Sequence, residues 1–334
     1  STTNYENYYA DIQVLDGNVS AFEPFRNCYI YSKFSGSGKL YFDINYVREY
    51  VQGDWTQFSG IVYARGLGTA TDGSQFMLNN TLGIPNGRVI TSGNTKIVCW
   101  KNAGTMYLGG LSGAAGTYLA GADTQNNAAT MTWIVGGTGT DETFAGIINN
   151  ECSNGSYKGT TSIIKDGNGY WRLTGANIYS GTTTVRGGML IVNGTHTGTG
   201  KITVQEGGLL GGKGTLPGAV VVLSGGVIQA GDPMAIPSNI ATMTVGPLTL
   251  NAGSQTNMEI NPTTMTSDKI ASSGAVVFGG KQNIKNTTTQ LLKDGDQFTL
   301  FSGTSFSGNF SEIIPSEPGD GLKWVFSNGV LKVV

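Results

Sequence analysis

The apolar residues of this chain fall in short alternating runs that are separated by glycine turns. Segments 184–190, 203–210 and 221–228 each carry β-branched residues, then a Gly-Gly pair, then aliphatic residues. The second glycine of the pair recurs after 20 and then after 18 residues. Repeats of this period, made of short strands and turns, are typical of solenoids, in which each unit buries its apolar side against the next. The pattern therefore predicts a β-helix, with its clearest coils in residues 172–260.

The N-terminal half repeats more loosely. Segments 35–62 and 112–148 both pass from a small-residue turn to a strand, a loop and a Phe-small-Gly-aliphatic run. We therefore expect residues 1–334 to form one continuous β-helix. Residues 1–30 are a candidate N-terminal cap, because an uncapped first coil would expose a row of unpaired backbone groups. Residues 295–334 are expected to supply strands that close the other end, because 322–326 and 329–333 alternate like a strand pair.

Three short segments depart from the strand pattern. Residues 83–87 read Gly-Ile-Pro-Asn-Gly, and both Pro and Asn-Gly predict a tight turn between two strands of segment 76–91. Residues 46–51 and 290–294 could each form one turn of helix, because a glycine soon follows and would end it. Neither helical segment is long enough to build a domain.

The glycine rhythm of the second half is interrupted in segment 230–239. Two prolines, Pro233 and Pro237, lie there, and proline cannot donate a hydrogen bond to a strand ladder. We therefore expect this segment to loop out of the coil. A functional feature added to the second half is expected there or near Asp268 and Lys269.

The composition agrees with a turn-rich, all-β chain. Glycine supplies 52 of the 334 residues, about twice its usual share, and its freedom to adopt positive φ suits frequent sharp turns. Hydrophobic residues make up 39%, which is enough for a folded core. The net charge of −2 excludes the basic footprint of a nucleic-acid-binding protein. No apolar run reaches the length of a transmembrane helix, so we expect no membrane-spanning segment.

The three cysteines are Cys28, Cys99 and Cys152, an odd number without the paired spacing of a zinc site or a disulfide framework. One disulfide and a free thiol would be compatible with an oxidising compartment. Because free cysteine is among the most buried residue types, we favour buried apolar thiols.

The segment 173–190 resembles a known repeat. It runs from Leu-Thr-Gly at 173–175 through Tyr-Ser-Gly at 179–181 to Gly-Gly-Met at 187–189. This order closely resembles the autotransporter-associated β-strand repeat and, more generally, the passenger domains of bacterial autotransporters. In that family such a run forms one coil of a right-handed β-helix, so the resemblance implies the same handedness here.

The resemblance also implies an exported location, at a bacterial cell surface or outside the cell, rather than an activity. The ending, from 295–301 to 329–333, is similar to the close of passenger-type repeats. No further run of alternating strands follows, so we expect no translocating β-barrel, a domain of that family, within this sequence.

Candidate catalytic and metal-binding residues are few. His196, the only histidine, lies in Gly-Thr-His-Thr-Gly, where we expect a surface turn rather than a base or a metal ligand. Asp123, Asp141 and Asp166 are scattered without the spacing of a calcium loop. Lys213 follows two glycines but lacks the strand-to-helix context of a phosphate loop. The sequence therefore predicts no catalytic residue, no metal site and no cofactor.

A polysaccharide lyase or glycoside hydrolase is the alternative, because many right-handed β-helices cleave polysaccharides. Glycosidases need two carboxylates across the scissile bond. The pair Asp141-Glu142 precedes a phenylalanine, as does Asp54, which favours a repeated turn element over catalysis. A lyase-type set of Arg48, Asp54 and Arg65 would rest on fold analogy alone.

Aromatic side chains could instead stack on sugar rings. The candidates are Trp55, Tyr63, Trp100, Trp133 and Trp171. We favour the structural alternative, in which each fills a corner or an end of the coil. Three or more aromatic residues on one flank, with acidic groups between them, would favour a glycan site.

The sequence thus predicts an all-β protein, a single-stranded right-handed parallel β-helix capped at its ends. We expect an exported, cell-surface or secreted, structural or adhesin-like protein without catalytic activity. Its candidate partners are polysaccharides or the glycans of host and bacterial surfaces. A spacer that holds another domain away from the cell is a third alternative.

Overall fold

The computed structural model of the protein describes residues 6–23, 28–45, 48–68, 74–100, 104–123, 130–151, 159–236 and 240–334. Across these ranges the chain forms strands, turns and loops and no helix, as the all-β prediction requires. In particular, no helix of the described residues is long and apolar enough to cross a membrane. The chain divides into two compact units, Ser1–Thr182 and Thr183–Val334. One continuous β-helix over residues 1–334 stays a prediction.

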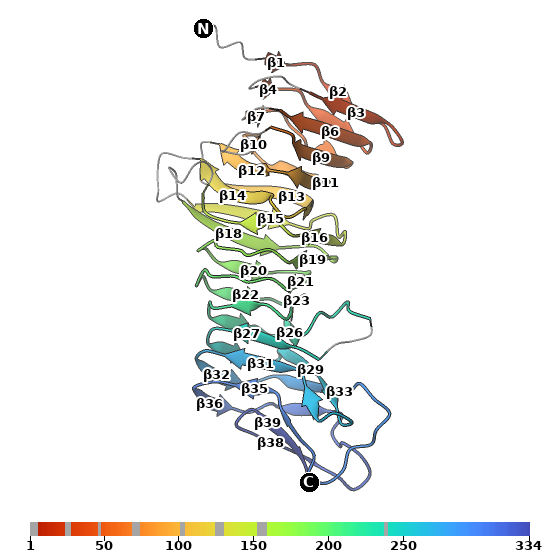
Figure 1. The fold of residues 1–334 in the computed structure, drawn as a ribbon, viewed down its shortest axis with the longest axis vertical. Coiled ribbons are helices and arrows are strands. Elements are labelled where there is room, and N and C mark those ends of the chain that lie inside the picture. The colour runs from red at the N-terminus through yellow and green to blue at the C-terminus, as the bar shows by residue number, and fades with distance from the viewer. Residues whose placement is uncertain are drawn as a thin grey trace. The chain divides into compact units, whose positions relative to one another are not determined.

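Unit 1 contains the strands β1 to β19 (Figure 1). Their bounds are β1 Glu6–Tyr8, β2 Ile12–Gln13, β3 Val19–Phe22, β4 Cys28–Ile30, β5 Phe34–Gly36, β6 Lys39–Ile44, β7 Arg48–Val51, β8 Gln57–Phe58, β9 Ile61–Gly66, β10 Ser74–Leu78, β11 Gly83–Gly93, β12 Thr95–Trp100, β13 Gly104–Gly113, β14 Tyr118–Asp123, β15 Thr130–Val135, β16 Glu142–Phe144, β17 Ile147–Ile148, β18 Thr160–Lys165 and β19 Tyr170–Leu173.

Strands of unit 1 pair in parallel with strands from the preceding and following turns of the chain. One sheet has the order β1-β4-β7-β10-β12-β14-β17, and a second has the order β2-β5-β8. A third series links β3, β6, β9, β11 and β13, then β15 and β18, with β16 and β19 alongside. Because parallel neighbours need a crossover connection, this arrangement is consistent with a β-helix.

Unit 2 contains the strands β20 to β39 (Figure 1). Their bounds are β20 Thr183–Val185, β21 Gly188–Val192, β22 Ile202–Val204, β23 Gly208–Gly212, β24 Thr215–Leu216, β25 Val220–Val222, β26 Val227–Ala230, β27 Thr242–Val245, β28 Leu248–Leu250, β29 Gln255–Asn261, β30 Thr266–Ser267, β31 Lys269–Ser272, β32 Ala275–Phe278, β33 Lys281–Asn286, β34 Gln297–Thr299, β35 Phe301–Ser302, β36 Ser305–Gly308, β37 Glu312–Ile314, β38 Trp324–Ser327 and β39 Val330–Val333.

The predicted repeat of unit 2 is present as strands stacked in register. One series of parallel strands runs β20-β22-β25-β28-β32-β36, and the next runs β21-β23-β26-β29-β33-β37. Val185, Val204 and Val222 are successive partners, and all three are fully buried. The corner glycines Gly207 and Gly225 have φ of 79° and 75°, which glycine adopts without the steric cost of a Cβ.

The cores of the two units differ in the side chains that fill them. In unit 1, Trp55 packs between Phe34 and Phe42, with ring centroids 4.2 and 5.8 Å away. The repeat coils of unit 2 bury aliphatic columns such as Val185, Val204 and Val222. In both units, strands such as β9, β22 and β25 alternate buried and partly exposed side chains, as expected when one face of a strand lines a core.

The predicted tight turn at residues 83–87 is wrong. These residues begin β11, whose pairing with β13 shifts register between Ile84 and Arg88, so the Pro-Asn-Gly sequence is accommodated as an irregularity within a strand. The turn precedes it at Asn80, whose side-chain amide donates to the Gly83 carbonyl and accepts from the Gly83 N–H, both at 2.9 Å. An asparagine side chain that bonds nearby backbone in this way stabilises a turn.

Neither predicted turn of helix forms. In segment 46–51, residues 46–47 lie outside the described residues, and Arg48–Val51 is strand β7, paired on both sides with β4 and β10. Segment 290–294 is an irregular loop that ends in a turn at Asp294. Pairing on both sides satisfies the backbone groups of β7 more fully than one isolated helical turn would.

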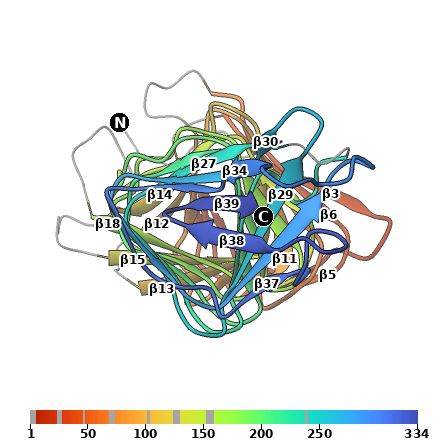
Figure 2. The ribbon, with the colours of Figure 1, turned by 90° about the horizontal axis from the view of Figure 1, so that it is seen from below.

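The C-terminal segment contains the predicted strand pair. Strands β38 and β39 are antiparallel neighbours, and β34 pairs antiparallel with the other side of β39. Seen end-on in Figure 2, β38 and β39 lie across the end of unit 2. Their capping role stays a prediction.

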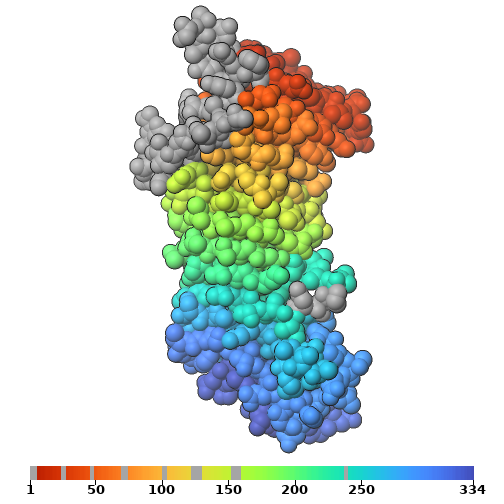
Figure 3. Space-filling model, in the orientation of Figure 1, coloured from red at the N-terminus to blue at the C-terminus, as the bar shows by residue number. Residues whose placement is uncertain are grey.

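Segment 231–236 leaves the coil between β26 and β27, as the prolines predicted. Ile236 is 97% exposed, and the segment projects from the surface of unit 2 (teal in Figure 3). Residues 237–239, which include Pro237, lie outside the described residues.

Two of the three cysteines are buried as predicted. Cys28 and Cys99 are 0% and 2% exposed, and burial raises the pKa of the Cys28 thiol above its usual range. Cys152 lies outside the described residues.

Candidate functional site

The aromatic residues considered for sugar stacking are mostly core residues. Trp55, Trp133 and Trp171 are fully buried. The indole N–H of Trp133 donates to the Ala120 carbonyl at 2.8 Å, and that of Trp171 donates to Leu111 at 2.9 Å. Their structural interpretation is therefore confirmed.

Tyr63 is partly exposed, but its ring already has a partner. It stacks on Tyr41 with ring centroids 4.5 Å apart and an interplanar angle of 9°. The Arg65 guanidinium lies over the Tyr41 ring at 4.5 Å. The stacking contact therefore covers one face of the Tyr63 ring. The side chain of Trp100 lies outside the described part of the chain.

The neighbouring carboxylates Asp141 and Glu142 also have hydrogen-bond partners within the protein. Glu142 is buried and accepts two hydrogen bonds from the Arg88 guanidinium, at 2.5 and 3.2 Å. Thr140 donates a third at 2.8 Å, and Ser112 donates a fourth. Its exposed neighbour Asp141 accepts from the Tyr170 N–H at 3.1 Å.

Asp54 and Arg65, two members of the lyase-type set, are each engaged with other residues. Asp54 is exposed and accepts from the Thr56 N–H at 2.8 Å, and this contact lowers the pKa of the Asp54 carboxyl. Arg65 forms a bidentate pair with Asp43 at 2.5 and 2.6 Å, which raises the pKa of its guanidinium. The side chain of Arg48 lies outside the described residues.

The remaining candidates do not gather into a metal site. Asp166 accepts from the Gly167 N–H at 3.0 Å, and the side chain of Asp123 is outside the described residues. Within the described ranges, no group of three or more His, Cys, Asp or Glu side chains is placed to hold a metal ion. Lys213 is exposed, and its N–H donates to Asn193 at 3.3 Å.

The prediction that His196 lies in a surface turn is wrong. Its side chain is only 3% exposed, and its N–H donates to the Thr215 carbonyl at 2.9 Å. Thr195 forms a parallel bridge with Thr215. Because its backbone pairs with the following turn of the chain, this segment is part of the coil. The small residues around His196 therefore form a corner of the coil rather than a solvent-exposed loop.

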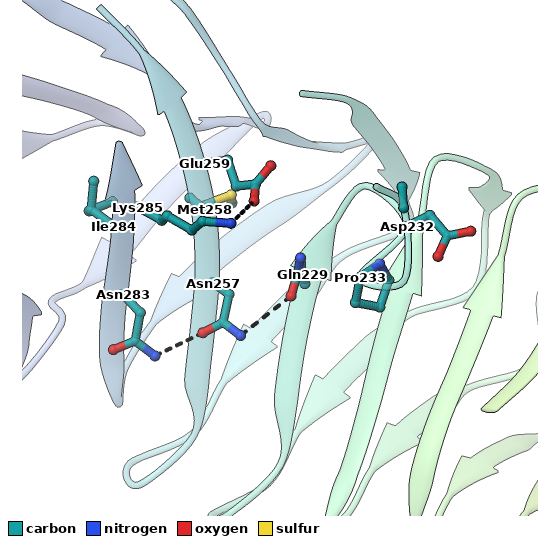
Figure 4. Close-up of a pocket in the computed structure, with 10 residues that line it drawn as sticks. Gln229, Asp232, Pro233, Asn257, Met258, Glu259, Asn283, Ile284 and Lys285 are labelled. Atoms are coloured by element: carbon teal, nitrogen blue, oxygen red, sulfur yellow. Dashed lines mark hydrogen bonds and ion pairs between the residues drawn. The ribbon is translucent and has the colours of Figure 1, made fainter. Parts of the chain in front are cut away.

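A pocket of about 410 Å³ lies in unit 2, between segment 231–236 and the outer faces of β29 and β33. We call it the amide pocket, because three side-chain amides lie in one column along it, those of Gln229, Asn257 and Asn283 (Figure 4). The strands β26, β29 and β33 place them as successive register partners. Stacked parallel strands set neighbouring amides about 4.8 Å apart.

Hydrogen bonds join the three amides into a directional chain. The Asn283 amide donates to the Asn257 oxygen at 2.8 Å, and the Asn257 amide donates to the Gln229 oxygen at 3.4 Å. All three side chains are partly exposed. Because each amide carries two N–H donors and two acceptor lone pairs, the chain holds the column in place and still leaves hydrogen-bonding capacity for a ligand.

Segment 231–236 forms one wall of the pocket and is anchored at three points. Gly231 and Gly212 exchange backbone hydrogen bonds of 2.7 and 2.9 Å. The Asp232 carboxylate accepts from the Asn193 amide at 2.9 Å and from the Met234 N–H at 3.0 Å. The Pro233 ring lies directly over Gly211, where an added Cβ would meet its Cδ at 2.9 Å.

The opposite wall carries an ion pair. Lys285 Nζ lies 2.9 Å from the Glu259 carboxylate. Glu259 is only 7% exposed, whereas the lysine side chain is 66% exposed, so the carboxylate is the fixed member of the pair.

Asp268 links this wall to Ala241, which precedes β27. It is fully buried, and its two carboxylate oxygens accept from the N–H groups of Ala241 and Glu259, both at 2.9 Å. Burial, partly offset by these bonds, raises the pKa of its carboxyl to about 7. Of the two places where the sequence predicted an added feature, the first contributes Asp232, Pro233 and Ala235 to the pocket lining, and the second, Asp268, bonds to the lining residue Glu259.

The sequence alone did not point to the amide column. Gln229, Asn257 and Asn283 are separated in sequence by more than the 20-residue repeat, since segment 231–236 and the β29–β30 hairpin lengthen two turns of the chain. The column could have been found by looking for outward-facing amides at matching positions of successive strands. Matching those positions requires the lengths of the two insertions, which the sequence pattern did not show.

Comparison with known proteins agrees with the resemblance drawn from residues 173–190. Residues 163–192 match the passenger-associated-transport-repeat family. The chain carries an autotransporter passenger repeat.

Two relatives share longer stretches with this repeat-bearing chain. It is 47% identical over 74 residues, 22% of its length, to the adhesin BmaC autotransporter of Brucella suis biovar 1 (strain 1330). It is 30% identical over 182 residues, 50% of its length, to an extracellular serine protease of Serratia marcescens. The matches span 2% and 16% of those two proteins. The repeat and both relatives identify an exported protein, at the cell surface or outside the cell.

Proposed function

We propose that this chain is an adhesin-like β-helical surface protein without catalytic activity, whose amide pocket binds a glycan. The observation that carries the proposal is the hydrogen-bonded column of Gln229, Asn257 and Asn283 beside a loop that strand stacking does not require. Amides supply both donors and acceptors, which sugar hydroxyl groups need. The relative named as an autotransporter adhesin supports the same class.

The proposed scaffold is a right-handed, single-stranded parallel β-helix. Parallel pairing of strands one turn apart supports it in each unit. Crossovers between parallel strands of one sheet are right-handed in nearly all proteins, so right-handed coils are the expected solution.

The non-catalytic assignment is supported by the way in which reactive groups are engaged. The only histidine, His196, is buried, which leaves no accessible imidazole for a serine-hydrolase mechanism. Glu142 is paired with Arg88 and Glu259 with Lys285. Each of these carboxylates would have to leave its ion pair before it could act on a substrate.

Polysaccharide cleavage is the second candidate. It is favoured by the presence of two carboxylates, Asp232 and Glu259, at the amide pocket, since glycosidases use a carboxyl pair. Asp232 is committed to Asn193 and Met234, however, and Glu259 to Lys285, so adhesion remains the preferred function.

Incubation of the purified protein and calcium with plant, host and bacterial polysaccharides tests both candidates. We expect size-exclusion chromatography to show unchanged polysaccharide lengths, and the protein to be retained on at least one immobilised polysaccharide. Shortened chains with the wild type, but not with Glu259→Gln, would establish cleavage and contradict the non-catalytic proposal.

A further inference from the structure

We infer that the amide pocket selects an uncharged, hydroxyl-rich sugar unit over an acidic one. This inference rests on the proposed glycan-binding function and adds the chemistry of the ligand to it. The geometry points to this selectivity through the amide column, the charges around it and the side chains that border it.

The amide column offers a neutral array of mixed donors and acceptors. Within the chain, Asn257 and Asn283 each donate one N–H along the column. Because an amide has two N–H groups, Asn257 and Gln229 keep donor capacity beyond the bonds of the column. The Asn283 amide also donates to the Gln255 oxygen at 3.4 Å, and the Asn283 oxygen ends the chain as an acceptor. A hydroxyl group can both accept and donate, so a sugar can satisfy such an array, whereas a carboxylate can only accept.

The charges around the pocket oppose an acidic ligand. Figure 4 shows the Asp232 carboxylate turned away from the amide column, where it holds Asn193 and the Met234 N–H. Lys285 is the cation of the lining, and its Nζ is paired with Glu259 at 2.9 Å. An anionic sugar would have to compete with Glu259 for that lysine and would meet a second carboxylate nearby, both unfavourable by Coulomb's law.

The lining gives hydrogen bonding without ring stacking. The ten residues around the pocket include no aromatic side chain, and the apolar contribution comes from Pro233, Ala235 and the strand residues Met258 and Ile284. A pocket of about 410 Å³ is at the lower end of the range for small-molecule sites. It therefore accommodates one or two sugar rings, and we expect weak affinity for each site.

Titration of the full chain with defined hexasaccharides tests the inference. The probes are neutral (cellohexaose, maltohexaose and mannohexaose) and acidic (hexagalacturonate). We expect at least one neutral probe to bind about tenfold or more tightly than hexagalacturonate. Asn257→Leu should weaken that binding about tenfold or more, because it removes the central amide, whereas Gln297→Leu, an exposed amide on β34, should leave it unchanged.

A variant that removes a charge gives a second test, in which the expected result is a gain of binding rather than a loss. Glu259→Gln releases Lys285 and removes one negative charge, so hexagalacturonate should bind about tenfold or more tightly than it binds to the wild type.

The outcomes separate this inference from the proposed function. Tighter binding of hexagalacturonate than of every neutral probe would overturn the selectivity. Neutral-sugar binding that survives Asn257→Leu would remove the amide pocket as the site but leave glycan binding intact. If the folded wild type, checked by circular dichroism, bound no probe and none of the immobilised polysaccharides, the glycan-binding function itself would fail.

Discussion

At the scale of single residues, several ionisable side chains are buried, and burial shifts their pKa toward neutrality. Glu49 is 1% exposed, and neither of its carboxylate oxygens has a hydrogen-bond partner. Lys165 is fully buried and donates to the carbonyls of Asp166 and Gly167 at 2.5 and 3.0 Å, and burial lowers its pKa to about 8. Asp268 is fully buried behind Glu259, a residue of the amide pocket whose N–H donates to the Asp268 carboxylate. These groups make folding stability sensitive to pH near neutrality.

Asp268 should lower the stability of unit 2 as the pH rises from about 4 to about 7. The pKa of its carboxyl in the folded protein, about 7, lies above the ordinary value for aspartate, about 3.9, so the folded protein keeps a proton that the unfolded chain releases. We expect Asp268→Asn to remove about 1.4 kcal/mol per pH unit of this dependence, while losing about 1–3 kcal/mol at pH 5 because one backbone N–H goes unpaired.

Urea unfolding of the wild type and Asp268→Asn at pH 5, 6 and 7 measures both effects. Parallel pH profiles for the two proteins would show that Asp268 does not titrate in this window.

Glu49 should destabilise unit 1 at alkaline pH. Burial raises the pKa of its carboxyl to about 8, with Asp43 adding to the effect. Cys28 and Phe76 are its strand partners in register, and neither is a cation. We expect Glu49→Leu to raise the free energy of unfolding at pH 9 by on the order of 3 kcal/mol, and by much less at pH 5, where the glutamate is protonated.

Thermal or urea unfolding at pH 5 and pH 9 checks this expectation. An equal effect of Glu49→Leu at both pH values would point to packing rather than ionisation.

At the scale of elements, two insertions in the stacked strands build the candidate site. Segment 231–236 separates β26 from β27, and the antiparallel pairing of β29 with β30 forms a hairpin beside it. Asp268, which follows β30, links the hairpin to Ala241. The pocket thus depends on how the loop is seated on the coil.

Replacing Gly211 should detach segment 231–236 from the coil without unfolding the coil. A Cβ at this position would meet Pro233 Cδ at 2.9 Å, closer than side-chain carbons pack. We expect Gly211→Val to increase thermolysin cleavage between Met234 and Ile236 several-fold and to weaken glycan binding, at a stability cost of about 1–3 kcal/mol.

Gly104→Val is the matched control, because a Cβ at Gly104 would meet no atom within 4 Å. If Gly104→Val and Gly211→Val raised cleavage of the loop equally, the contact with Pro233 would not be what holds it.

At the scale of the whole molecule, the chain has few charged residues and consists mainly of parallel strands joined by turns. Only 13% of its residues are charged, so its surface presents mainly neutral polar groups. In a repeat architecture each turn contacts its neighbours and stability adds up along the stack. Such a surface suits contact with uncharged hydroxyl-rich polymers more than electrostatic capture.

The exported location predicts accessibility on intact cells. We expect proteinase K added outside the producing bacterium to digest the chain, or the chain to be recovered from the culture medium, while a cytoplasmic enzyme stays intact. Protection of the chain to the same degree as the cytoplasmic enzyme would contradict export.

Much of the fold could be predicted from local pattern. The recurring Gly-Gly pairs fixed the register of Leu190, Leu210 and Ile228, which are successive strand partners. The alternation at residues 322–326 and 329–333 predicted the C-terminal strand pair, which the structure contains as β38 and β39. The errors came where local preference competed with pairing: Pro85 and Asn86 suggested a turn, but β13 pairs with the residues before and after them, so they form an irregularity within β11.

By itself, the sequence determined the all-β class, the stacking of the repeat coils, the departure of segment 231–236 and the passenger-type repeat, since each depends on residues close together in the chain. Only the tertiary structure decided that His196 is buried and that Gln229, Asn257 and Asn283 form one column. The physical reason is that these features depend on pairing between distant strands, whose register shifts with the length of every insertion between them.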